Sequence, residues 1–169
     1  LHVEILNAHY GVRIDCGGMH QTATELDACV QFPDMRDVEI DFPDLYGIYA
    51  EDFQFLKCIG CYVHGSSTTA NGIKLANNKF MSYGAEILGG KVDSAQGSLV
   101  YSTVQGTHVT DNDLGSANEG GQGGAAVELQ ADTAGSTVAH SIIAGNTMCY
   151  FHGGVPTTMT GVNIGPTLT

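Results

Sequence analysis

Positive charge is scarce in this sequence. Its 169 residues include six Lys and Arg against 18 Asp and Glu, which gives a formal net charge of −12. Because phosphate binding needs clustered Lys and Arg, we expect no nucleic acid partner and no attraction to an anionic membrane surface. Apolar runs are short as well. None approaches the roughly 20 residues of a membrane-spanning helix, so we expect no membrane insertion.

Helix-forming segments are equally rare. No stretch of about 12 residues places apolar side chains at i, i+3, i+4 and i+7 without an interruption by Gly or a β-branched residue. Short runs rich in Val, Ile, Thr and Tyr instead alternate with Gly, Asn and Asp, and Gly alone contributes 23 residues. This pattern predicts an all-β protein. The length suits a single domain over residues 1–169, which we expect to be a fragment of a longer chain because Leu1 already begins a strand-like segment.

The cysteines form no regular pattern. There are five, and an odd number without regular spacing is a poor disulfide framework. Cys58 and Cys61 form a CxxC pair, but no second pair of Cys or His stands at zinc-ligand spacing. In a strand, residues three positions apart point to opposite faces, so we expect two buried thiols rather than zinc or redox chemistry.

Carboxylates cluster between residues 34 and 44. Their oxygens suit Ca²⁺, but their spacing differs from that of a calcium-binding loop. We therefore expect a solvated edge or a contact between subunits, and we assign no metal and no cofactor to the chain. The residues concerned are Asp34, Asp37, Glu39, Asp41 and Asp44.

A repeat runs through the chain. Asn78, Asn112 and Asn146 stand 34 residues apart, and weaker copies place Asn7 and Asp44 at the same position. Asn tolerates left-handed backbone angles and bonds locally, so it suits a turn after each strand. The pattern predicts about five turns of one unit. Three further columns keep the interval: Ile73, Thr107 and Ser141; Leu75, Val109 and Ile143; and Phe80, Leu114 and Met148.

A second short strand is expected after each turn. The five segments are 11–15, 47–51, 84–88, 126–130 and 161–165, and each places two apolar or small residues two positions apart, as on one buried face. Segments 55–63 and 98–104 are candidates for a third strand. Three short strands per unit predict a parallel β-helix of about five coils with a period of about 34 residues, and the units of this length with Asn turns favour the right-handed form. Asn side chains stacked on successive coils would then form an amide ladder.

These features resemble the right-handed parallel β-helices of the pectate-lyase-like group, in which an Asn ladder follows a short apolar strand. That group includes pectinases and the trimeric tailspikes with which bacteriophages hold and cut surface polysaccharides. The pectinase motifs NTD, DD, GHG and RIK do not occur here. The resemblance therefore implies a tailspike or tail fibre module, with coils from three chains side by side in a homotrimer.

The outward column of the second strands contains the candidate site residues. In order they are Arg13, Tyr49, Glu86, Glu128 and Asn163. Glu86 and Glu128 are expected as neighbours on adjacent coils, where two carboxylates can act as the acid and the nucleophile or base of a glycosidase. Tyr49 is expected to stack on a sugar face, while Arg13 and Asn163 hold hydroxyls or carboxylates. A solvated acidic stripe without catalysis is the alternative.

The function expected from these observations is that of a virion component. It would bind host cell-surface polysaccharide, with itself and other virion proteins as partners, and whether it also depolymerises the polysaccharide stays open. One alternative is a structural decoration or spacer protein of the virion without a ligand. The other is a secreted polysaccharide lyase or glycoside hydrolase.

Overall fold

The computed structural model describes residues 3–6, 9–15, 30–66, 69–77, 82–115, 125–130, 140–148 and 160–164. Of residues 3–6, 148 and 160–164, only the backbone is considered. All regular structure in these ranges is β-strand, which confirms the all-β prediction. Within the same ranges, no helix is long and apolar enough to cross a membrane.

The strands form three sheets, named here A, B and C. Sheet A contains β1 (Val3–Leu6), β5 (Val38–Asp41), β8 (Tyr62–His64), β11 (Lys91–Asp93), β14 (Asp113–Leu114) and β17 (Thr147–Met148). Sheet B contains β2 (Tyr10–Ile14), β6 (Tyr46–Glu51), β9 (Asn71–Ala76), β12 (Val100–Ser102), β15 (Ala125–Leu129) and β18 (Thr160–Ile164). Sheet C contains β3 (Val30–Gln31), β4 (Asp34–Arg36), β7 (Phe53–Ile59), β10 (Tyr83–Leu88), β13 (Gln105–Thr110) and β16 (Ile142–Ala144).

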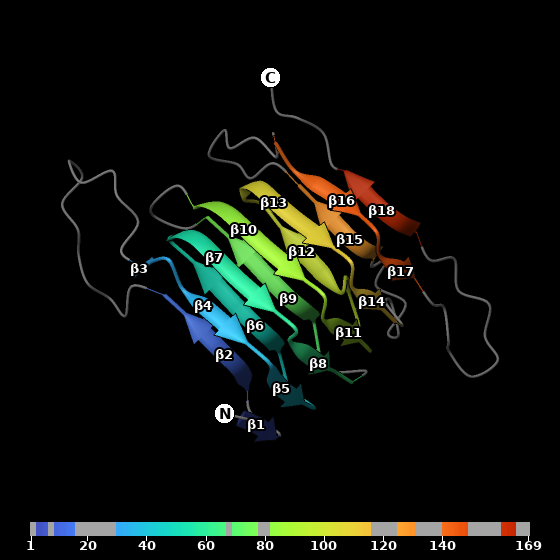
Figure 1. The fold of residues 1–169 in the computed structure, drawn as a ribbon. Coiled ribbons are helices and arrows are strands. Elements are labelled where there is room, and N and C mark those ends of the chain that lie inside the picture. Colours follow the sequence, from blue (N-terminus) through green and yellow to red (C-terminus); the bar gives the residue numbers. More distant parts are fainter. Residues whose placement is uncertain are drawn as a thin grey trace.

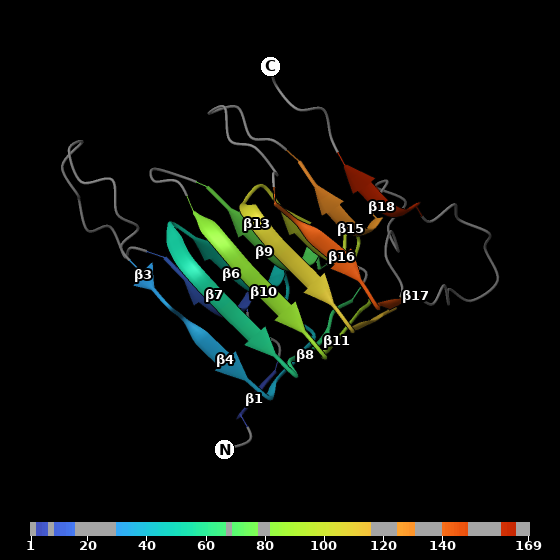
Figure 2. The ribbon, with the colours of Figure 1, turned by 45° about the horizontal axis from the view of Figure 1, so that its top comes forward.

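The chain visits sheets A, B and C in rotation, and one passage through the three sheets is called a round. Each inner strand pairs in parallel with strands of the preceding and following rounds, and the strands at the ends of a sheet pair on one side (Figure 1). Figure 2 shows β4, β7, β10, β13 and β16 side by side, all pointing the same way. This arrangement is consistent with a parallel β-helix. Sheets A and B stack six strands each, whereas β3 and β4 of sheet C both pair with β7.

The core lies between the three sheets. Inward residues at matching positions of successive strands stack in columns, such as Ile48, Ile73, Val100 and Val127 of sheet B, all at most 1% exposed. The inward apolar pairs predicted in β6, β10 and β15 are buried, and Val12 and Ile14 of β2 pack partly buried against the same core. Stacking like this leaves one face of each sheet for solvent or partners.

The period of about 34 residues predicted from the sequence does not hold for every round. In sheet C, the paired residues Cys58, Ile87, Val109 and Ile143 are 29, 22 and 34 residues apart. Leu75, which the 34-residue interval aligned with Val109, lies in β9 of sheet B. The rounds differ in length because the connections between strands differ, while the strands keep their register.

The Asn ladder is present between two successive rounds. Asn112 Nδ2 donates to Asn146 Oδ1 at 3.0 Å, and the backbone N–H of Asn112 donates to the same oxygen at 2.9 Å. Asn112 Oδ1 accepts from Gly90 N at 2.9 Å, so glycine takes the corresponding place in the round before. Asp44, predicted at this position, instead lies between β5 and β6. Asn7 and Asn78 lie outside the described residues.

Left-handed residues turn the chain from sheet C into sheet A. The turns contain Asp37, Gly60, Gly89, Asp111 and Gly145, with φ between 52° and 67°. Four of them directly precede the column that holds Cys61, Gly90, Asn112 and Asn146. Asn112 is 2% exposed, so its amide satisfies backbone groups that a buried corner would otherwise leave unpaired.

The CxxC pair spans one of these corners. Both thiols are buried, as expected, but the prediction that they point to opposite faces is wrong, because Gly60 (φ 64°) turns the chain between them. A hydrogen bond with Cys61, together with burial, raises the pKa of Cys58. The two thiols therefore lie next to each other in the core.

Candidate functional site

A cleft of about 440 Å³ lies on the outer face of sheet C. Its lining comes from β7, β10 and β13 and from His140, two residues before β16. We call it the sheet C cleft. The residues used below are Phe55, Lys57, Tyr83, Gly84, Glu86, Gly106, His108 and His140.

The floor and ends of the cleft follow from a column of left-handed residues. Phe55, Gly84, Gly106 and His140 have φ values of 56°, 72°, 73° and 59° and stand at the same level of β7, β10, β13 and the approach to β16. The two glycines carry no side chain, so the middle of the column is hollow. A Cβ on Gly84 would lie 2.7 Å from Phe55 Cδ1, which shows how closely the ring covers this strand.

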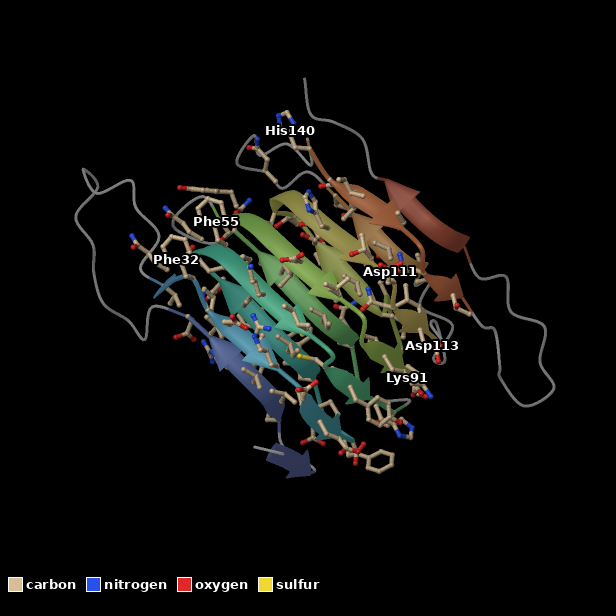
Figure 3. All side chains as sticks on the ribbon, in the orientation of Figure 1. Phe32, Phe55, Lys91, Asp111, Asp113 and His140 are labelled. Atoms are coloured by element: carbon tan, nitrogen blue, oxygen red, sulfur yellow. The ribbon has the colours of Figure 1, made fainter. Side chains whose placement is uncertain are left out.

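Phenylalanine in a left-handed conformation is rare, because the Cβ then crowds the backbone. Phe55, the third residue of β7, and Phe32, which directly follows β3, both adopt it. Figure 3 labels the two residues at the same end of sheet C. Such strained residues cluster at sites where the side chain must be held in a particular direction. Here the conformation directs large rings outward: Phe32 is 64% exposed and Phe55 46% exposed.

Three aromatic rings form a wall at this end of the cleft, of which Phe55 and Tyr83 line the cleft and Phe32 stacks on Phe55. Phe32 and Phe55 stack with centroids 5.5 Å apart and an interplanar angle of 10°. Tyr83 meets Phe55 edge to face, with centroids 5.2 Å apart. Exposed aromatic faces in a concave surface mark a binding site more often than they serve the fold.

Polar groups lie beside this wall. Glu86 pairs in register with Lys57 on one side and His108 on the other, and Lys57 Nζ lies 3.7 Å from Glu86 Oε2. His108 Nε2 is 3.2 Å from the carbonyl oxygen of His140. The Glu86 side chain is 40% exposed and that of Lys57 49%, so both remain accessible from the cleft. A carboxylate, an ammonium and an imidazole therefore converge next to an aromatic surface.

The predicted pair of neighbouring carboxylates is not formed. Glu86 lies in β10 of sheet C and Glu128 in β15 of sheet B, so they cannot be neighbours within one column. The sequence-based prediction grouped segment 84–88 with the strands that form sheet B, because its apolar residues have the same spacing as theirs. The strands that stand between Tyr49 and Glu128 are β9 and β12, which contribute Lys74 and Tyr101.

The rest of the predicted column does lie in one sheet. The strand register of sheet B aligns, in order, Arg13, Tyr49, Lys74, Tyr101, Glu128 and Asn163. For Asn163 the pairing of its backbone with Glu128 is described, and its side chain lies outside the described residues. Four of the five predicted site residues thus occupy matching positions of sheet B, whereas the cleft lies on sheet C.

Glu128, Arg13 and Tyr49 are each held by neighbours. Both carboxylate oxygens of Glu128 accept hydrogen bonds, from Ser98 Oγ and Gln130 Nε2. Arg13 donates to Asp15, which raises the pKa of its guanidinium. Tyr49 donates to Glu51 Oε2 at 2.5 Å, and burial followed by this hydrogen bond raises the pKa of its phenol.

The acidic cluster is divided between sheets. Asp34 lies in β4 of sheet C, paired with Arg36 at 3.0 Å, whereas Glu39 and Asp41 lie in β5 of sheet A. Within the described part of the chain, no three His, Cys, Asp or Glu side chains are grouped so as to hold a metal ion.

Sequence reasoning missed most of the sheet C cleft. Phe55, Tyr83, His108 and His140 have no common interval, because the rounds differ in length. A signal was present in Tyr83–Gly84 and Gln105–Gly106, where glycine follows a polar or aromatic residue at the start of a strand. The chain matches no protein-family model, no curated protein and no solved structure.

Proposed function

We propose that this chain binds a saccharide in the sheet C cleft. The observation that supports the proposal is the aromatic wall of the exposed Phe32 and Phe55 and the half-buried Tyr83, next to Glu86 and its neighbours. An apolar surface with a few placed polar groups is typical of small-ligand sites. The C–H faces of a sugar ring suit the wall, and its hydroxyls suit the carboxylate, ammonium and imidazole groups, which offer both donors and acceptors.

The side chains that line the cleft favour binding of the saccharide without cleavage. Among the described residues that line the cleft, Glu86 is the one carboxylate. Glycosidases of the common type use two carboxyl groups on either side of the bond that is cleaved. A spacer protein without a ligand would have no use for an aromatic wall beside grouped polar side chains, so the structural alternative is less favoured.

The wider setting of the proposal comes from the sequence. A right-handed parallel β-helix with an Asn ladder would fit a bacteriophage tailspike or tail fibre module, a homotrimer in the virion that holds host surface polysaccharide. The Asn112–Asn146 pair is the structural feature that supports this resemblance. Because the cleft runs across several strands, it suits a chain of sugars rather than one.

The experiment compares two phenylalanines that are alike in everything but place. Phe55 and Phe42 are each 46% exposed and have φ values of 56° and 53°, but Phe42 follows β5 of sheet A and packs against His64. Oligosaccharides released from bacterial surface polysaccharides are titrated into the wild type, Phe55→Ala and Phe42→Ala by calorimetry. Loss of an aromatic contact of this size weakens binding by roughly tenfold or more.

We expect Phe55→Ala to lose most of its affinity and Phe42→Ala to keep it. Equal affinity of both variants for every oligosaccharide that the wild type binds would contradict a site at the sheet C cleft. Thermal unfolding of both variants shows whether the comparison is between folded proteins.

A further inference from the structure

A second cluster of aromatic side chains covers the outer face of sheet B. It consists of Tyr10, Arg13, Tyr46, Tyr49, Lys74 and Tyr101, from the four consecutive strands β2, β6, β9 and β12, and we call it the tyrosine ladder. Four of the seven tyrosines of the chain and two of its six Lys and Arg residues are gathered here. The proposed function above does not involve this face.

The rings and cations of the ladder alternate. Tyr46 lies 5.8 Å from Tyr10 and 5.3 Å from Tyr49, measured between ring centroids. The Arg13 guanidinium lies 5.2 Å from the centroid of Tyr10 and 5.9 Å from that of Tyr49. The Lys74 ammonium lies 5.0 Å from the centroid of Tyr46 and 5.7 Å from that of Tyr101. These contacts fix the directions of side chains that would otherwise be flexible.

The two cations differ in their charge balance. Arg13 is paired with Asp15. Lys74 donates to Tyr46 Oη at 3.3 Å and contacts two rings, but none of its contacts among the described residues is with a carboxylate. An ammonium has three N–H donors, and the hydroxyl uses one. In a chain with a net charge of −12, Lys74 is thus a cation held in place without a carboxylate partner among the residues that the structure describes.

We propose that the tyrosine ladder binds an acidic saccharide, with a sugar carboxylate on Lys74 and the ring faces against Tyr46 and Tyr101. The carboxylate supplies the anion that Lys74 lacks, and charge-assisted hydrogen bonds of this kind are strong. Tyrosine supplies large rigid contact area at a low entropic cost, which suits a flat apolar ligand face. The ligand differs in charge, and the site in place, from those of the sheet C cleft.

The acidity of the chain limits what the ladder accepts. Phosphate chains of nucleic acids need many clustered cations. A single carboxylate per sugar unit needs one, and a short oligosaccharide brings few further charges near the acidic surface. We therefore expect binding of short acidic oligosaccharides rather than of dense polyanions.

The test uses a trisaccharide of uronic acid and a neutral trisaccharide of the same linkage as probes. Both are titrated by calorimetry into the full chain carrying Phe55→Ala, so that the sheet C cleft does not contribute. To this background we add Lys74→Gln, Lys74→Arg or Lys91→Gln. Lys91 is the matched control, because its ammonium also lies over a tyrosine, 5.5 Å from the centroid of Tyr62, but is 3.2 Å from Asp93.

We expect the acidic probe to bind, and Lys74→Gln to weaken it by roughly tenfold or more, the usual size of a charged hydrogen bond. Lys74→Arg and Lys91→Gln should stay within a few-fold of the background, and the neutral probe should bind much more weakly. Unchanged affinity in Lys74→Gln, or equal binding of the two probes, would overturn the proposal.

A measurement on the unsubstituted protein covers the case in which Lys74→Gln does not fold. The aromatic NMR signals of Tyr46 and Tyr101 should shift on addition of the acidic probe, while those of Tyr62 stay in place. Shifts confined to Tyr83, which lies in the sheet C cleft, would assign the acidic saccharide to that site and refute the ladder.

Discussion

Backbone conformation at single residues shapes the face of sheet C. Phe55, Gly84, Gly106 and His140 share positive φ, yet two are glycines and two carry large side chains. A non-glycine residue in this conformation costs about 1–2 kcal/mol. Phe55 and His140 have this cost and lie at the two ends of the cleft. Gly84 and Gly106, which form the open floor, do not have it.

The two glycines permit a matched comparison at this scale. Alanine at either position carries the cost of a positive φ, about 1–2 kcal/mol of unfolding free energy. A Cβ on Gly106 meets only backbone atoms at 3.6 Å or more, whereas one on Gly84 lies 2.7 Å from the Phe55 ring. Gly84→Ala should therefore be the more destabilising, as measured by urea unfolding. The reverse order would mean that the Phe55 ring moves aside without cost.

Single residues also show what the sequence could predict. The predicted alignment of Arg13, Tyr49, Glu128 and Asn163 agrees with the strand register of sheet B, because alternation along a strand identifies equivalent positions whatever the length of the loops. Glu86 was placed in the wrong sheet, because its strand has the same local pattern as those of sheet B. The alternation of apolar residues within a strand predicts which side chains point inward. It does not predict which strands pair with each other, because that depends on the length of the whole round.

Among the larger elements, the corner between sheets C and A is the most regular feature. Every described round turns there through a left-handed residue, followed in two of them by an Asn. The Asn spacing therefore revealed a real structural unit. It did not give the period of the whole chain, since Gly90 and Cys61 occupy the same place in other rounds and the loops between sheets vary in length.

Replacement of Asn112 tests how much this corner contributes to the free energy of unfolding. Asn112→Ala leaves Gly90 N–H without its acceptor and removes the Nδ2 donor from the oxygens of Ile87, Thr110 and Asn146. Thr110 O and Asn146 Oδ1 each keep a backbone donor, Gly89 N and the N–H of residue 112. A buried unsatisfied group costs about 1–3 kcal/mol. We expect a loss of about 2–4 kcal/mol in unfolding free energy. Asn146→Ala, which has fewer described partners, serves as the comparison and should lose less.

On the scale of the whole molecule, the inner and outer faces of the three sheets have different roles. Their inner faces share one core, while the outer faces of sheets B and C carry different chemistry: a ladder of tyrosines and cations on one, a cleft with an aromatic wall on the other. The all-β class and the inward columns could be predicted, because composition and alternation report them directly. The separation of the two outer faces could not, because it depends on which strand pairs with which.

Because the rounds are stacked, we predict that the loss of unfolding free energy on a core substitution depends on the position of the residue along the stack. Ile73 lies in β9, with Ile48 paired on one side and Val100 on the other, and is 1% exposed. Ile14 has the same side chain but lies in β2, the strand at the end of sheet B, with Ala50 as its one described partner there. In stacked architectures each unit contacts only its neighbours, so an end position has half as many.

Ile73→Ala should therefore cost about 3–5 kcal/mol, in the upper part of the range for buried isoleucine, and Ile14→Ala about 1–2 kcal/mol. Urea unfolding followed by circular dichroism measures both. The slope of the unfolding curve adds a second criterion, since a loss confined to the first round would leave it lower for Ile14→Ala than for Ile73→Ala. Equal losses in the two variants would show that the end of the stack is covered by other parts of the chain or by another copy, and that the packing of rounds does not set the stability alone.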